Sequence, residues 1–167
     1  TIPRYTYSLN LNFGWKGLRL GLLFQGVGKT DGYLNTYYVM PSNQGGTFRK
    51  EHLDWASAEN PNGKTPRLTS ANKNNWYDSS FWMKSAAYLR LKNIQLGYTL
   101  PERISMKFGV KRFKIYFNAQ NLLTFSNCSF IDPESSEFGS NMNSGGANSG
   151  RNYPNLRYFG AGLNITF

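Results

Sequence analysis

The chain has 167 residues with 12 Phe, 11 Tyr, 4 Trp and 17 Gly, a composition that favours β-sheet over helix. No stretch approaches the roughly 20 consecutive apolar residues of a membrane-spanning helix, which excludes helical membrane proteins but not strands that alternate polar and apolar residues. The net charge of +10 fits either a nucleic-acid partner or one basic end of a membrane protein.

The first predicted element is a strand over residues 4–15, in which apolar and polar side chains alternate without a break. Lys16 and Gly17 then predict a tight turn. The same alternation continues over residues 18–25, so we expect these two strands to form a hairpin with one apolar face and one polar face.

Residues 28–84 lose this alternation and are rich in Gly, Asn, Pro and Ser, over a length that is unusual for a loop in a compact domain. The segment contains nine aromatic residues, too many for a solvated linker, so it predicts an ordered loop that faces a ligand or a partner. Aromatic rings with polar tips suit sugar rings or peptide side chains, but they equally suit packing within the loop or contact with a lid protein. The candidates for substrate or partner contact are Trp55, Trp76, Tyr77, Phe81 and Trp82.

Alternation returns over residues 87–100, but the apolar parity changes between Leu91 and Ile94. One extra residue near Lys92 and Asn93 would keep both halves of the strand on the same face of a sheet. The sequence therefore predicts a β-bulge at this point.

A short basic connection follows this strand. Residues 102–109 predict about one helical turn, and another alternating strand covers residues 110–123. Between residues 85 and 126, seven Lys and Arg stand against Glu102 alone, and five of the seven lie in or beside the connection. No RNP, zinc-finger or helix-turn-helix pattern accompanies them, so we expect no nucleic-acid partner.

The segment of residues 127–155 is a second loop rich in Gly, Asn and Ser. Its carboxylates Asp132, Glu134 and Glu137 could supply oxygen ligands to Ca²⁺, but the ligand spacing of an EF-hand is missing. We therefore prefer a role in stabilising the loop and expect no metal or cofactor. Cys128 is the single cysteine, so it forms no intrachain disulfide and has no metal-ligand spacing.

His52 and Asp54 are the weak signal for acid–base chemistry in this chain. No Ser or Cys nucleophile is placed with them, and both fall in the long first loop. We therefore predict no catalytic residue and no enzymatic activity.

The last predicted strand covers residues 156–167, with an apolar face opposite a polar or small one. An unpaired hydrophobic strand at the end of a soluble domain would invite aggregation, so this strand must pair with another. An insertion machinery could recognise such a strand by β-augmentation. The residues of this expected assembly signal are Phe159, Leu163, Ile165 and Phe167.

The connections alternate between short and long: 16–17 and 101–109 are short, whereas 28–84 and 127–155 are long. In an up-and-down antiparallel arrangement both long loops leave from one end, which is the asymmetry of outer-membrane barrels. We therefore predict an all-β fold, an antiparallel up-and-down segment of a transmembrane β-barrel with two long extracellular loops. The alternatives are a β-sandwich and a small structural barrel without transport.

Two sets of side chains would then have roles in the barrel. We expect aromatic residues at the membrane boundary, namely Tyr5, Trp15 and Tyr98. The polar face would line a wet lumen with the amides of Asn10, Asn12, Asn118, Gln120 and Asn164.

About five strands cannot close a membrane barrel, because the smallest barrels use about eight. Unpaired backbone groups at the two edges of the sheet would each cost several kcal/mol in lipid. We therefore expect residues 1–167 to be the last part of a larger barrel, whose remaining strands pair with both edges.

Five motifs in a fixed order carry a family resemblance: YLRLKNIQLGYTLP, then FKIYFNAQNLLTF, DPE at residues 132–134, YP at residues 153–154, and the final GLNITF. Together they resemble the carboxy-terminal part of the SusC/RagA-type TonB-dependent outer-membrane transporters. The opening PRYTYSLNLNFGWKGLRLGLLFQGVG resembles an earlier hairpin of the same barrels.

The resemblance implies a barrel of about 22 strands that encloses a plug domain. It also implies a SusD-like lipoprotein as a lid, energy coupling through TonB, and import of oligosaccharides or peptides across the outer membrane of a Gram-negative bacterium. The plug and the segment that contacts TonB would lie outside residues 1–167. The alternative function is that of a soluble or surface-attached β-sandwich that binds glycans.

Overall fold

The computed structural model describes residues 3–34, 39–41, 48–69, 74–128, 131–135, 147–148 and 153–167. They fall into two compact units. The sheet unit contains residues 4–28, 87–126 and 155–167, and the loop unit contains the described residues of 1–3, 29–86 and 127–154.

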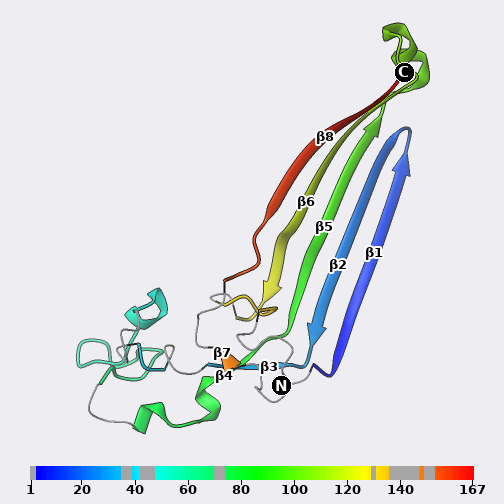
Figure 1. The fold of residues 1–167 in the computed structure, drawn as a ribbon. Helices are drawn as coiled ribbons and strands as arrows, with labels where there is room; N and C mark the ends of the chain where they lie inside the picture. The colour runs from blue at the N-terminus through cyan, green and yellow to red at the C-terminus, as the bar shows by residue number, and fades with distance from the viewer. Residues whose placement is uncertain are drawn as a thin grey trace. The chain divides into compact units, whose positions relative to one another are not determined.

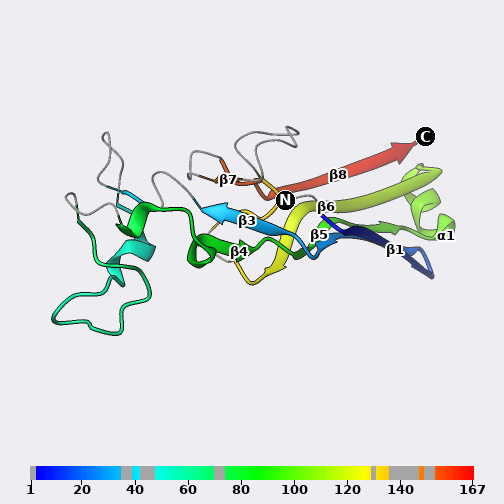
Figure 2. The same ribbon diagram turned by 90° about the horizontal axis from the view of Figure 1, so that it is seen from below.

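The sheet unit is one antiparallel sheet of five long strands, which Figures 1 and 2 show as a single layer. Consecutive strands of this unit are neighbours, in the order β1-β2-β5-β6-β8. The strands are β1 (Tyr5–Trp15), β2 (Leu18–Gly28), β5 (Tyr88–Thr99), β6 (Arg112–Ser126) and β8 (Tyr158–Thr166). The predicted all-β, up-and-down antiparallel arrangement is thus confirmed for these residues.

The turn between β1 and β2 has the geometry that a two-residue hairpin needs. Lys16 has φ of 42° and Gly17 has φ of 88°, and two positive φ angles match the twist of the flanking strands. A Cβ at Gly17 would also collide with the carbonyl of Thr99 on the next strand. The predicted tight turn is confirmed, and only glycine fits its second position.

The predicted β-bulge lies where the parity of the sequence changes. In the pairing of β2 with β5, Phe24 is opposite Leu91 and Leu23 is opposite Asn93, so Lys92 is the extra residue. Because of this insertion, Leu89 and Leu91 lie on the same face as Ile94 and Leu96. β6 shifts register at the same level, and there Asn121 has φ of 53°.

The connection from β5 to β6 contains the short helix α1 (Glu102–Ser105) and the 3-10 turn η5 (Met106–Phe108). It ends at Gly109, whose φ of 69° is the left-handed conformation that commonly terminates a helix. The predicted helical turn is confirmed. No helix among the residues that the structure describes is long and apolar enough to cross a membrane.

The loop unit joins segments of both long loops in a second, three-stranded sheet of order β4-β3-β7. β3 (Asp31–Leu34) pairs antiparallel with β4 (Met83–Ser85) and parallel with β7 (Ala147–Asn148). Its further elements are the 3-10 turns η2 (Lys50–Leu53), η3 (Asn74–Trp76) and η4 (Ser80–Trp82). A small core of Leu34, Val39 and Trp82 supports it. The sequence predicted an ordered first loop, but not its pairing with the second.

Within the described residues, the outer edges of β1 and β8 have no strand partner, and these two strands do not pair with each other. The sheet unit therefore does not close into a small barrel by itself. The pairing of both edges with other strands stays a prediction.

We predict that deletion of Lys92 is tolerated, because it removes the extra residue and leaves Leu91 opposite Phe24 and Asn93 opposite Leu23, with the apolar side chains of β5 still on one face. Deletion of Arg90 should instead abolish assembly of the sheet, because either Leu89 or Leu91 would then turn to the polar face. Abundance of folded protein in the membrane fraction measures the effect, and equal abundance of the two deletion variants would contradict the role assigned to the bulge.

Candidate functional site

The polar face of the sheet unit carries a continuous row of amides and glycines. One residue from each strand contributes to this row in direct register: Asn12, Gly21, Gln95, Asn118 and Gly160. An open hollow of about 760 Å³ is lined by the first four residues of this row, and also by Arg19 and Lys114. Such a surface offers hydrogen-bond donors and acceptors to water or to a polar solute.

The sequence predicted part of this polar face. The five amides expected there lie on one face in the observed register, since Asn10, Gln120 and Asn164 follow the same parity as Asn12 and Asn118. Gln95 was not selected, although the parity of its strand after the bulge places it there. Arg19 and Lys114 could not be placed beside this amide row from the sequence, because that requires knowing which strands are neighbours.

The opposite face is apolar and has no cover within the sheet unit. One row runs through Leu11, Leu22, Ile94, Ala119 and Phe159. Leu9, Phe13 and Trp15 on β1 expose 53%, 57% and 69% of their surface. A single layer with large exposed apolar side chains lacks a core in water, so this face requires apolar surroundings.

Aromatic residues occur at both ends of the apolar face. At one end Trp15 lies in the same row as Leu18 and Tyr98. At the other end the rings of Tyr5 and Tyr7 lie over Gly28 and Gly26, where a Cβ would collide with them. Tyr5, Trp15 and Tyr98 thus share the face that the sequence predicted; their position at a membrane boundary stays a prediction.

Three of the four predicted assembly-signal residues lie within β8 on the apolar face. Phe159 is opposite Ala119, Leu163 is opposite Ile115, and Ile165 is opposite Phe113. Phe167 follows the end of β8 and is 79% exposed. The four residues therefore present an apolar strip on an edge strand, and their role in assembly stays a prediction.

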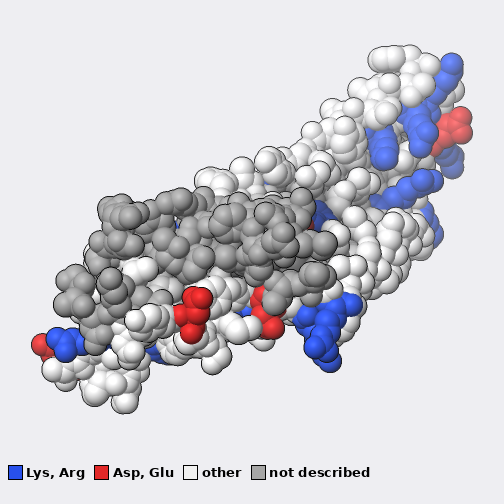
Figure 3. Space-filling view, turned by 60° about the horizontal axis from the view of Figure 1, so that its bottom comes forward, with Lys and Arg blue, Asp and Glu red and all other residues white. Residues whose placement is uncertain are grey.

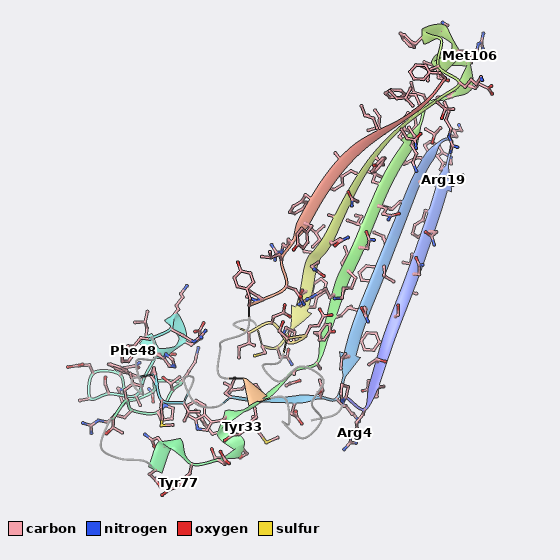
Figure 4. All side chains as sticks on the ribbon, in the orientation of Figure 1. Arg4, Arg19, Tyr33, Phe48, Tyr77 and Met106 are labelled. Atoms are coloured by element: carbon pink, nitrogen blue, oxygen red, sulfur yellow. The ribbon has the colours of Figure 1, made fainter. Side chains whose placement is uncertain are left out.

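Three of the aromatic candidates in the loop unit are accessible. Trp55, Tyr77 and Phe81 expose 38%, 67% and 45% of their surface, and Figure 4 shows Tyr77 well apart from Phe48 within this unit. The Nζ of Lys84 lies 5.1 Å from the ring centroid of Phe81, a cation–π arrangement. No ring-to-ring contact joins Trp55, Tyr77 and Phe81 among the described residues. They are three separate exposed rings, and their contact with a ligand or a partner stays a prediction.

Trp82 is placed differently, because only 6% of its surface is exposed. It packs in the core with Leu34 and Val39, and its indole N–H donates to the carbonyl of Asn75 at 3.3 Å. Of the three roles considered for the aromatics, namely contact with a ligand, packing within the loop and contact with a lid protein, packing within the loop therefore fits Trp82. The side chain of Trp76 lies outside the described residues, although its backbone is part of η3.

Trp55 sits at the start of a tight loop held by hydrogen bonds. The carbonyl of Asp54 accepts from the backbone N–H and the hydroxyl of Thr65, both at 3.0 Å. The carboxylate of Asp54 accepts from the side-chain amide of Asn60 at 3.1 Å. Gly63 packs so closely on the Trp55 backbone that a Cβ would not fit. These contacts fix the backbone that carries Trp55.

The weak acid–base pair seen in the sequence has structural roles. His52 is 4% exposed, and its Nδ1 accepts a hydrogen bond from the backbone N–H of Arg49 at 2.9 Å. Asp54 holds the loop just described and lies 3.9 Å from Lys64.

The carboxylate cluster of the second loop contains a local turn. The carboxylate of Asp132 accepts from the backbone N–H of Glu134 at 3.1 Å, and the Asp132 carbonyl accepts from the N–H of Ser135. This geometry fits the expected loop-stabilising role. Glu137 lies outside the described residues. Within the described part of the chain, no group of three or more His, Cys, Asp or Glu could hold a metal ion.

Two groups of the loop unit have shifted acidity. Burial raises the pKa of Tyr33, and the carboxylate of Asp78, which accepts a hydrogen bond from the phenol at 2.8 Å, raises it further. Burial also raises the pKa of the Cys128 thiol. Both groups thus favour their neutral forms, so neither provides a reactive anion near neutral pH.

The geometry of the sheet unit agrees with comparisons to known proteins. No family model matches the chain. TonB-dependent receptors P3 and P26 of Formosa agariphila are each 31% identical to it, over 99% of this chain and 16% and 17% of their own lengths. Two structures of the RagAB peptide importer, open-open and closed-closed, align with TM-scores of 0.70 and 0.73 at 26% identity, over 99% of this chain and 17% of theirs.

The chain is related to the TonB-dependent receptors of the SusC/RagA type. The resemblance read from the five sequence motifs is confirmed. These relatives are receptors and transporters, in agreement with the expectation that the chain is not an enzyme. The chain spans only about a sixth of the length of the relatives it matches, as the 16% and 17% shares state.

We predict that charge is tolerated on one face of this receptor-like sheet and not on the other. Ile94→Arg should cost roughly 2–4 kcal/mol of folding free energy, because it places a cation near the middle of the apolar face, which we expect to meet lipid. Gln95→Arg, the next residue on the same strand, should be close to neutral because it lies in the amide row. Unfolding of the purified protein from lipid bilayers measures both, and equal costs would mean that the two faces are wrongly assigned.

We predict that Trp82→Ala destabilises the loop unit by about 3–5 kcal/mol, as expected when a large buried aromatic side chain is removed from a core. Limited proteolysis should then cut the loop unit faster while the sheet unit stays resistant. Tyr77→Ala is the matched control, since its side chain is exposed. Equal cleavage rates of the two variants would contradict the burial of Trp82.

Proposed function

We propose that this chain forms the carboxy-terminal segment of the barrel wall, and part of the extracellular surface, of a SusC-like TonB-dependent transporter. The observation that carries the proposal is the single-layered sheet with an uncovered apolar face opposite an amide row. Its strands of 9 to 15 residues are long enough to cross the hydrocarbon layer, which takes about 9–11 tilted residues.

The rest of the same transporter would complete the wall. In a barrel of about 22 strands the earlier strands pair with the outer edges of β1 and β8. This pairing satisfies backbone groups that would otherwise cost several kcal/mol each in lipid. The amide face then lines a wet lumen that contains the plug domain, and TonB acts through the segment that contacts it.

The orientation follows from the connections. Outer-membrane barrels have short periplasmic turns and long extracellular loops. The turn at Lys16–Gly17 and the α1–η5 connection lie at one end of the sheet unit, because Trp15, Tyr98 and Leu163 share one row. We assign this end to the periplasm and the loop unit to the cell surface.

The proposed cargo is an oligosaccharide or a peptide, with a SusD-like lipoprotein as the lid over the extracellular side. Trp55, Tyr77 and Phe81 supply exposed rings that can stack on either class of ligand or contact the lid. The similarity to the RagAB peptide importer favours peptides of the two classes.

The glycan-binding β-sandwich is the weaker reading. A sandwich needs a second sheet packed on the apolar face, and the sheet unit has one layer among its described residues. The similarity to TonB-dependent receptors also supports the transporter.

Uptake by cells tests this proposal. Cells that depend on the intact protein should accumulate fluorescent oligopeptides or oligosaccharides, and loss of TonB should abolish this uptake. The triple variant Trp55→Ala, Tyr77→Ala and Phe81→Ala should lower uptake about tenfold at unchanged abundance, since each ring contributes about 0.5–1.5 kcal/mol to stacking.

The control for the triple variant is Asn62→Ala, an exposed substitution in the same loop as Trp55. It should leave uptake unchanged. TonB-independent uptake, or no uptake of either cargo, would contradict the proposed function. Unchanged uptake in the triple variant alone would instead assign the three rings to other contacts.

A further inference from the structure

The α1–η5 connection between β5 and β6 has its apolar side chains on the outside. Ile104, Met106 and Phe108 expose 45%, 57% and 76% of their surface. The buried side chain of this segment is Ser105, at 1% exposure. A helical turn on a protein surface in water shows the reverse pattern, because its apolar residues pack inward. This inversion indicates that something apolar covers the outside of the connection.

The position of Ser105 explains why the inversion is stable. Its hydroxyl lies 3.2 Å from the carbonyl oxygen of Glu102 and 3.3 Å from that of Lys111, so it can donate to either end of the connection. The carbonyl of Ser105 also accepts from the N–H of Val110 at 3.2 Å. The segment is therefore held by internal hydrogen bonds, which leaves its apolar side chains free for an external contact.

Basic residues alternate in the sequence with the three apolar side chains. The exposed basic residues of the connection and the strand that follows are Arg103, Lys107, Lys111 and Arg112. Among the described residues none of them forms an ion pair with an acidic side chain. Figure 3 shows Lys and Arg gathered at this end of the sheet beside the acidic Glu102, and the neighbouring hairpin adds Lys16. The surface is thus strongly positive around an apolar centre.

The connection also lies at the level where the apolar face ends. It starts four residues beyond Tyr98, which is in one row with Trp15, so it begins within about 14 Å of this aromatic row at the usual rise per residue. Lys16 extends its Nζ to 5.1 Å from the Trp15 ring. Aromatic rings accompanied by lysines mark the level of lipid headgroups in membrane proteins.

We propose that residues 102–111 are an interfacial anchor for anionic phospholipids; this inference rests on the proposed membrane location. Ile104, Met106 and Phe108 enter the hydrocarbon edge of the leaflet, and Arg103, Lys107 and Lys111 bind the headgroup phosphates. Arg112 follows the parity of the amide face and is not part of the anchor. An anionic phospholipid fits both features of this surface, because its phosphate meets the cations and its acyl chains meet the apolar side chains. A nucleic acid would supply phosphates but no hydrocarbon. An acidic periplasmic protein is the alternative that the experiment distinguishes.

The test uses the full-length protein in nanodiscs, with a fluorophore at Met106→Cys in a background free of other cysteines. Nanodiscs of phosphatidylcholine are compared with nanodiscs that contain phosphatidylglycerol. We expect nitroxide-labelled lipid to quench the fluorophore, and aqueous iodide to lose access to it, as the phosphatidylglycerol fraction rises. A fluorophore at Asn62→Cys in the loop unit is the reference and should stay accessible to iodide throughout.

Removal of charge supplies the second measurement. The double variant Lys107→Gln and Lys111→Gln should need at least about fivefold more phosphatidylglycerol for half-maximal quenching of the fluorophore. One juxtamembrane cation strengthens binding to an anionic membrane by about this factor. The control is the double variant Lys50→Gln and Lys64→Gln, which removes two positive charges from the loop unit. It should leave the phosphatidylglycerol dependence of the quenching unchanged.

Two outcomes would overturn the proposal while the proposed function stands. In an inserted protein, a Met106 label that remains open to iodide at every lipid composition would exclude the anchor. A label that is shielded from iodide but not quenched by lipid would indicate a protein contact instead. Failure of the protein to insert into nanodiscs at all would count against both the anchor and the proposed function.

Discussion

The structure depends on one constraint: the sheet unit has two faces of opposite polarity and no core of its own. Backbone hydrogen bonds between five neighbouring strands hold it together, and hydrophobic burial must come from the surroundings of the apolar face. Every residue of these strands must therefore stay on its correct face. The bulge at Lys92 corrects the single parity error, and the glycines beneath Tyr5 and Tyr7 make room for rings on the apolar side.

The loop unit follows the ordinary rules of a small aqueous domain. It buries Leu34, Val39 and Trp82, and it fixes its irregular segments through polar side chains such as Asp54 and Asp132. This division separates two requirements on one chain. The sheet unit needs strict alternation, whereas the fold of the loop unit depends on its small core and tolerates changes at exposed residues such as Asn62.

The sheet was predictable from the sequence because a period of two is a strong signal over ten or more residues. The parity change between Leu91 and Ile94 even located the bulge, and the family motifs indicated the relatives. The parallel pairing of β3 with β7 was not predictable, since Ala147 and Asn148 lie in a run of Gly, Asn and Ser without alternation. The exposure of the loop aromatics was not predictable either. Phe81 and Trp82 are adjacent in the sequence, yet Phe81 is half-exposed and Trp82 is buried.

The same β3–β7 pairing has a consequence for the order of folding. Tyr33 pairs with Ala147, and both β5 and β6 lie between them in the chain. Contacts of such large sequence separation form slowly, because a long stretch of chain must first be organised. We therefore expect β7 to pair with β3 only after β5 and β6 are in place. The loop unit would then reach its final structure later than the sheet unit.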